Sequence, residues 1–252
     1  METKTTTALV VLRAEECRSL IGQAVAHLPQ VIRAAGRGRM VIVGGATNRH
    51  VVRHLLKEDP GVAAFAMGWI QGGALGETPP EGRGPGPYLL ERGRLSRGWP
   101  GPLLEKFEAG DIYIKGANAI DHNGHTAILL GSPLGGSIGL ALPLLHARGG
   151  ELIVPVSLEK MIPSIPATGG LLGQGRVERV MGTPVGIMPI PAGTATVVTE
   201  VTAFKTLFGV TATPVAAGGL AECAGALTLH LQGPIPQVDA AWNGVQAIRK
   251  NI

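Results

Sequence analysis

The amino-acid sequence predicts a single α/β domain, a three-layer, Rossmann-like arrangement in which helices cover both faces of a mainly parallel sheet. Three observations lead to this prediction. Of the 252 residues, 45% are hydrophobic and only 16% are charged, which is typical of buried strands and argues against a coiled coil or a disordered chain. Short apolar runs alternate along the chain with segments of helical spacing. The 38 glycines and 19 prolines follow no collagen period and therefore indicate many tight connections.

Periodicity and capping residues place the elements of the N-terminal half. Helices are taken from apolar residues at helical spacing, and strands from short continuous apolar runs. Pro29 is expected to kink or divide the first helix, because proline lacks the amide hydrogen used in a helix interior. Thr47 or Asn48 is expected to cap the second helix. The predicted elements are a helix over 15–34, a strand over 40–43, a helix over 49–57, a strand over 62–70, a helix over 103–109 and a strand over 111–115.

The same alternation continues to the C-terminus. Asn123-Gly124 is a dipeptide typical of tight hairpin turns, and it separates two apolar segments. Strands that alternate with helices imply right-handed crossovers and hence parallel strands. The predicted elements are strands over 126–130, 151–156, 185–190 and 213–217, and helices over 138–147, 194–207, 221–231 and from 238 onward.

Residues 72–102 interrupt this pattern, since 15 of these 31 residues are Gly or Pro. Structureless loops longer than about 12–15 residues are uncommon in compact domains. We therefore interpret the segment as a hairpin or lid inserted into a single domain, 1–252, with a disordered segment as the alternative. Strand pairing is expected around residues 88–95.

Charge and cysteine content exclude several classes of function. The formal net charge is +4, and residues 1–100 hold 13 basic against 8 acidic side chains, a balance that favours an anionic small molecule. Dense basic runs interleaved with aromatic residues are missing, so no nucleic-acid partner is expected. Cys17 and Cys223 form no metal-binding or redox motif, and they fit a reducing cytoplasm. Residues 1–7 are polar, and no apolar run reaches the ~18 residues of a membrane span.

Three glycine-rich turns are the candidate ligand-binding segments. In a parallel sheet, ligands bind beyond the carboxyl ends of strands, where such turns expose backbone N–H groups at helix N-termini. Glycine lets the backbone approach a phosphate or carboxylate, and neighbouring hydroxyl or amide side chains add donors. Helix packing or capping is the alternative role of each turn. The turns contain Gly44, Gly45, Thr47 and Asn48; Gly135, Gly136 and Ser137; and Gly218, Gly219 and Glu222.

Four further side chains are candidates for chemistry. Lys115 ends a predicted strand, where it meets a ligand anion or pairs with Asp121. Asp121 either orients the following turn or acts as a base, and Asn118 lies between the two. Glu222 is the candidate acid, base or nucleophile of the third turn. His50 and His54, which share a helix face, are interpreted as ordinary surface residues, and the basic stripe beside them as a solvated face.

The string Gly110-Asp-Ile-Tyr-Ile-Lys-Gly-Ala-Asn-Ala-Ile-Asp121, followed by Asn123-Gly124 and Gly135-Gly136, resembles a known superfamily. It joins ribose-5-phosphate isomerase, glucosamine-phosphate deaminase, the CoA transferases and the lactate-utilisation LUD proteins. The match covers about 30 residues, 111–138. The resemblance implies a Rossmann-like fold and a site at these turns. The chain departs from the isomerases at Asn118, where they carry an acidic residue, and an amide is no general base at neutral pH.

These observations favour an enzyme of this superfamily that binds a phosphorylated or carboxylated metabolite at the glycine-rich turns. In this hypothesis Lys115, Asn118, Asp121 and Glu222 are the candidate catalytic residues. The resemblance is compatible with a sugar-phosphate isomerase-like or a CoA-transferase-like reaction. The alternative is a non-catalytic ligand sensor or assembly subunit with the same fold, which Asn118 favours. We expect no metal or cofactor, and we expect a homodimer.

Overall fold

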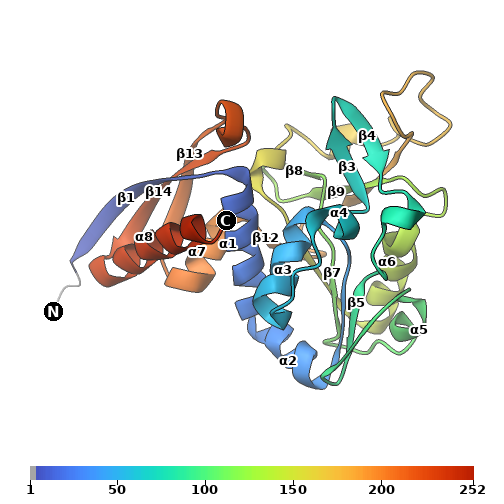
Figure 1. Ribbon diagram of the computed structural model, residues 1–252, viewed down its shortest axis with the longest axis horizontal. Helices are drawn as coiled ribbons and strands as arrows, with labels where there is room; N and C mark the ends of the chain where they lie inside the picture. The colour runs from blue at the N-terminus through green and yellow to red at the C-terminus, as the bar shows by residue number, and fades with distance from the viewer. Residues whose placement is uncertain (1–3) are drawn as a thin grey trace.

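A computed structural model describes residues 4–252, and it confirms an α/β protein (Figure 1). Its centre is a six-stranded sheet in the order β12-β10-β7-β2-β5-β6. The first four strands of that order are mutually parallel, and β5 and β6 form an antiparallel hairpin beside β2. The strands are β2 (Arg39–Ile42), β5 (Tyr88–Glu91), β6 (Arg94–Arg97), β7 (Ile112–Ile114), β10 (Glu151–Pro155) and β12 (Thr196–Val198).

Three smaller sheets accompany the central one. The two ends of the chain meet in an antiparallel sheet, because β1 (Thr5–Leu12) and β13 (Thr211–Ala217) both pair with β14 (Leu227–Pro234). A second antiparallel sheet contains β8 (Ala119–Ile120), β9 (Thr126–Leu130) and β11 (Gly186–Ile190). A separate hairpin joins β3 (Gly68–Gln71) and β4 (Ala74–Glu77).

Helices lie on both sides of the six-stranded sheet (Figure 1). Along β2, Met40 and Ile42 pack with the helices of one side, whereas Val41 and the following Val43 pack with those of the other side. This alternation follows from the two-residue period of a strand. The helices of the first side are α1 (Ala14–His27), α2 (Pro29–Arg37) and α3 (Ala46–Leu56), and those of the second are α5 (Gly101–Leu104) and α6 (Gly136–Arg148).

Helix α1 lies between the central sheet and the terminal sheet, whose helices α7 (Glu200–Phe208) and α8 (Ile235–Lys250) also contact it. Nine of the 14 residues of α1 are buried. Gly22 is the point where α1 and α3 approach most closely, since a Cβ there would lie 2.5 Å from His50 Cβ. The structure thus needs a residue without a side chain at this crossing.

Most predicted elements are confirmed, including the division of the first helix at Pro29, which becomes the first residue of α2. Four predictions are wrong. The helix predicted over 103–109 ends at Leu104, the last residue of α5. The strand predicted over 62–70 begins only at β3, because the four residues of α4 (Val62–Phe65) form a helical turn. The helix predicted over 194–207 starts at Glu200, after β12. The helix predicted over 221–231 is a 3-10 turn, η4 (Ala221–Cys223), followed by β14.

The prediction of a mainly parallel arrangement is also wrong. Among residues 4–252, three strand pairings are parallel, and the other seven are antiparallel. The misassigned β14 explains part of the difference, because it pairs antiparallel on both sides. Its sequence, Leu227-Thr-Leu-His-Leu231, alternates apolar and polar residues as a half-buried strand does.

Residues 72–102 are built around two hairpins. The second part of the segment forms β5 and β6, which confirms the pairing expected around residues 88–95. Because β5 pairs with β2, this hairpin extends the central sheet. The first part contains β4 and the 3-10 turn η1 (Pro80–Gly82). A role of the segment as a lid stays a prediction.

The α1–α3 crossing gives a test of the packing. Gly22→Ala should lower the free energy of unfolding by about 1–3 kcal/mol, because the added methyl group meets the His50 backbone as well as its side chain. Gly36→Ala is the matched control, since Gly36 is an exposed helical glycine with nothing within 4 Å of the added Cβ. It should be stabilising by up to about 1 kcal/mol. Urea unfolding measures both, and equal effects would contradict the close crossing.

Candidate functional site

The parallel strands β2, β7, β10 and β12 end at one edge of the central sheet, which we call the carboxyl edge. Helices α3 and α7 begin there, directly after β2 and β12. Helix α6 ends near the opposite edge of the sheet, because Glu151, which follows it closely, donates its N–H to the carbonyl of Asp111 just before the start of β7. Helix α6 therefore begins on the side of the carboxyl edge. The first N–H groups of each helix lack intrahelical partners and can face an anion.

Asn48 holds the ends of two strands together at this edge. Its side chain is fully buried, and Nδ2 donates to the carbonyl oxygens of Val43 (2.7 Å) and Ile114 (3.3 Å). Oδ1 has no hydrogen-bond partner among the described residues, and it lies toward Gly116, where an added Cβ would be 3.9 Å away. The expected capping role is wrong, because α3 already begins at residue 46, so that Asn48 and Thr47 lie inside it.

The two glycines before α3 have different roles. A Cβ on Gly44 would overlap the carbonyl oxygen of Phe65, so this glycine is required for packing against α4. Gly45 is the N-cap of α3, and nothing lies within 4 Å of a Cβ built on it. Gly45 therefore leaves open space beside the unpaired amides of α3, as the sequence hypothesis required.

Two lysines without carboxylate partners lie at the carboxyl edge. Lys115 is the first residue after β7 and is half-buried, and burial, together with repulsion from Lys160, lowers its pKa to about 8. Lys160 ends the 3-10 turn η2 (Leu158–Lys160), donates from Nζ to the carbonyl of Ala117 (2.9 Å), and also has a pKa lowered by burial. Neither lysine forms an ion pair within residues 4–252, so the pairing of Lys115 with Asp121 is not present.

The side chains of Asp121 and Asn118 accept hydrogen bonds from backbone N–H groups and so stabilise the local conformation of the chain. Asp121 Oδ1 accepts from the backbone N–H groups of Asn123 (3.0 Å) and His125 (3.1 Å), and Oδ2 accepts from that of Ile165 (3.0 Å). Burial opposes ionisation of Asp121, but these donors outweigh it and keep its pKa below the ordinary value. Asn118 Oδ1 accepts from the N–H of Leu129 (3.0 Å). The geometry fits the turn-orienting role of Asp121 and leaves its oxygens occupied.

The second predicted turn leads into α6 as expected. Gly135 and Gly136 both have positive φ values, 75° and 60°, which favour glycine. Ser137 lies near the hydroxyl group of Tyr113, which is buried in β7. The turn is also covered, since Gln174 donates to the carbonyl of Gly131. Ser137 therefore lies beside β7.

The third predicted turn lies in the terminal sheet, between β13 and β14. Gly218 and Gly219 are exposed, and Glu222 is an exposed residue of the 3-10 turn η4, not of a helix N-terminus. The turn reaches the region of η2 through Gly225, where a Cβ would lie 2.7 Å from Glu159 Oε2. The structure thus does not bring Glu222 into a strand-to-helix turn beside Lys115.

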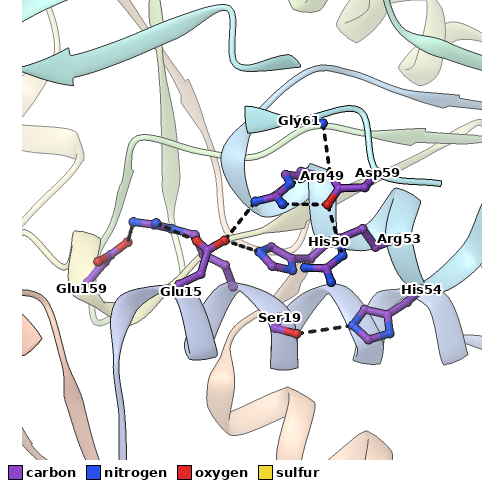
Figure 2. Close-up of polar contacts among 10 residues, drawn as sticks. Glu15, Ser19, Arg49, His50, Arg53, His54, Asp59, Gly61 and Glu159 are labelled. Carbon is purple, nitrogen blue, oxygen red and sulfur yellow. Dashed lines mark hydrogen bonds and ion pairs between the residues drawn. The ribbon is translucent and has the colours of Figure 1, made fainter. Parts of the chain in front are cut away.

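A chain of ion pairs connects η2 with α1 and α3 (Figure 2). Arg18 contacts Glu159 (3.0 Å) and Glu15 (3.2 Å), and Glu15 in turn accepts from His50 (3.0 Å) and Arg49 (3.2 Å). The hydrogen bond from His50 is the main cause that lowers the pKa of Glu15 to about 2. The interpretation of His50 as a surface residue is wrong, because it is fully buried against this carboxylate.

The basic stripe of α3 is largely neutralised by the same network. Arg49 makes two hydrogen bonds to Asp59, at 2.6 and 2.7 Å, and Arg53 lies 3.6 Å from that carboxylate. Lys160 and Glu200, the buried first residue of α7, were not among the site residues predicted from the sequence. Glu200 Oε2 accepts from the N–H of Leu158 (3.0 Å), and burial raises its pKa. Their position just after β10 and β12 is the signal that could have found them.

Comparisons of the chain with protein-family models, curated proteins and solved structures find no match. Across residues 4–252, no three His, Cys, Asp or Glu side chains are arranged to hold a metal ion, and no helix is long and apolar enough to cross a bilayer. Cys17 and Cys223 are both free. The chemistry of the carboxyl edge is therefore argued from its own side chains.

The lowered pKa of Lys115 predicts a stability cost. Lys115→Met should raise the free energy of unfolding at pH 7 by about 1–3 kcal/mol, because the variant no longer buries an unpaired ammonium group. The unfolded chain binds more protons than the folded one between about pH 8 and pH 10.5, so the stability of the natural protein should rise over this range. The advantage of the variant should therefore shrink toward pH 10.5.

Chemical unfolding at pH 7 and pH 10 measures this difference. Lys205→Met is the control, since Lys205 is exposed on α7 and forms no ion pair within the described chain. It should change stability little at either pH. Destabilisation by Lys115→Met would mean that the ammonium group has a stabilising partner.

Proposed function

We propose that the protein binds an anionic metabolite, phosphorylated or carboxylated, at the carboxyl edge of the central sheet. The observation that carries the proposal is the pair Lys115 and Lys160, two half-buried lysines that form no ion pair within residues 4–252 and whose pKa values are lowered by burial, although Glu159 and Glu200 partly oppose this shift at Lys160. An anion between them would offset both the burial of charge and their mutual repulsion. The unpaired amides of α3, made accessible at Gly45, supply further donors.

Lys115 is also the side chain at this edge best suited to proton transfer. A pKa of about 8 leaves roughly a tenth of the amine neutral at pH 7, and a group near neutrality serves as both base and acid. Asp121 and Asn118 already accept backbone hydrogen bonds, and Glu222 is exposed in the terminal sheet. If the protein is an enzyme, Lys115 replaces these three as the candidate catalytic residue.

Membership of the isomerase and CoA-transferase superfamily is part of the proposal. It is supported by the resemblance over residues 111–138 and by the parallel strands β2, β7, β10 and β12 with helices on both sides. In this proposal the four parallel strands and the helices on their two sides form a three-layer, Rossmann-like core. The cytoplasmic setting and the homodimer stay predictions from the sequence.

A non-catalytic ligand sensor is the second candidate. The observation that favours it is the engagement of Asp121, whose two carboxylate oxygens accept three backbone N–H groups and so are not free to move a proton. Such a protein would still bind an anion at Lys115 and Lys160. The two candidates therefore share the binding site and differ only in turnover.

Calorimetric titration tests the binding. Inorganic phosphate, ribose 5-phosphate and coenzyme A serve as probes, and at least one should bind, with affinity that weakens as the pH rises above about 8 and Lys115 loses its charge. Lys115→Met and Lys160→Met should each weaken binding about tenfold, the effect of one lost ionic contact. Lys205→Met should leave it unchanged. Binding of none of the probes, or binding insensitive to both variants, would refute this site.

A further inference from the structure

A groove of about 340 Å³ lies among α1, α3, α7 and α8, away from the residues of the carboxyl edge. Its volume falls in the range of small-molecule sites, which begins near 300 Å³. One wall is polar and includes Ser19, Arg53 and His54, and the opposite wall is apolar and includes Phe208 and Ile248. No Asp or Glu of residues 4–252 lines it.

The polar wall is built around a neutral imidazole. His54 Nε2 lies 3.4 Å from the hydroxyl oxygen of Ser19, which is 6% exposed (Figure 2). Burial and then repulsion from surrounding cations lower the pKa of His54 to about 4. The basic residues responsible are His50, Lys57 and Arg53 of α3 and His27 of α1, while α7 and α8 bring no titratable side chain to the lining.

A serine beside a histidine also occurs in hydrolases, but the charges here argue against nucleophilic catalysis. Such catalysis generates an imidazolium, which a carboxylate normally stabilises. The ionisable residues that act on His54 are all basic, so they would not stabilise an imidazolium. The same field favours an anion in the groove, and Arg53, held only loosely to Asp59 at 3.6 Å, is positioned to contact it.

We propose that this groove binds a small organic carboxylate with an apolar body. The carboxylate lies against Arg53, His54 and Ser19, and the hydrocarbon part covers Phe208 and Ile248. The bound charge offsets the repulsion on His54 and raises its pKa. Because the groove contacts four helices, a ligand there also stabilises their packing. The site is independent of Lys115 and of the function proposed above.

The experiment titrates the protein with acetate, butyrate, hexanoate and benzoate at pH 7, with 1-hexanol as the neutral analogue of hexanoate. Calorimetry should show binding that strengthens from acetate to hexanoate, and the alcohol should bind at least about tenfold more weakly. The NMR titration of His54 should move to higher pH when hexanoate is bound. Binding of none of the carboxylates, or equal binding of alcohol and acid, would overturn the proposal.

Three variants locate the site. Arg53→Gln removes the cation, and Ala247→Trp places a bulky side chain in the groove from an exposed position of α8. Each variant should weaken hexanoate binding about tenfold, the first because an ionic contact is lost and the second because apolar contacts are lost. Arg33→Gln, an equal change of charge at an exposed position of α2, should have no effect.

Urea unfolding of each variant confirms that it is folded before binding is compared. Lys115→Met separates the two proposals, since it should weaken phosphate-type binding at the carboxyl edge about tenfold and leave hexanoate binding intact. Hexanoate binding that persists unchanged in both Arg53→Gln and Ala247→Trp would place the ligand elsewhere and refute the groove.

Discussion

The burial of α1 is the constraint on which the rest of the structure depends. The helix is packed between the central sheet and the terminal sheet, so it has almost no free face for its polar residues. Glu16 is fully buried and is satisfied by Arg13 at one end of the chain and Arg249 at the other. Because a buried charge without a partner is costly, these pairs are a condition of the packing. They also tie the two ends of the chain to the same helix.

The same requirement explains why α1 and α3 carry a network of charges. Glu15 forms ion pairs with His50, Arg49 and Arg18. Arg18 also pairs with Glu159, which lies next to the carboxyl edge. Lys115 and Lys160 differ from these charged residues of α1 and α3, because neither lysine forms an ion pair within residues 4–252. Two half-buried lysines without an ion pair at a strand edge are a local instability that a bound anion would reduce.

The sequence was a good guide to elements whose signals are local. Pro29 marked the boundary between α1 and α2, and the Asn123-Gly124 turn joined β8 to β9. The wrong predictions concern segments whose secondary structure depends on partners far away in the sequence. Residues 227–231 became a strand because β1, more than 200 positions away, supplies the partner of every residue of β14. The first residues assigned to the helix over 194–207 instead complete the central sheet as β12.

The candidate site was predicted in its place but not in its chemistry. Lys115, Gly45 and the turn before α6 lie where the strand pattern put them. The role of Asp121 depends on the backbone of Ile165, 44 positions on, and no local spacing carries that information. The place of Lys160 after β10 was visible in the sequence, but its contact with the carbonyl of Ala117, 43 positions earlier, is a property of the folded chain.

The charge count of the sequence was a similarly limited guide to function, because it does not show which charges pair after folding. The basic excess of the first hundred residues favoured an anionic ligand, yet five of the eleven arginines in that segment form ion pairs with Asp59, Glu15, Glu16 or Asp111. What distinguishes a binding cation is the absence of a partner after folding. Lys115 meets that condition fully and Arg53 in part, in two separate places, and neither stood out in the sequence by charge alone. The proposed preference for anions therefore rests on the desolvation and the missing ion pairs of these side chains, and the net charge of +4 contributes little to it.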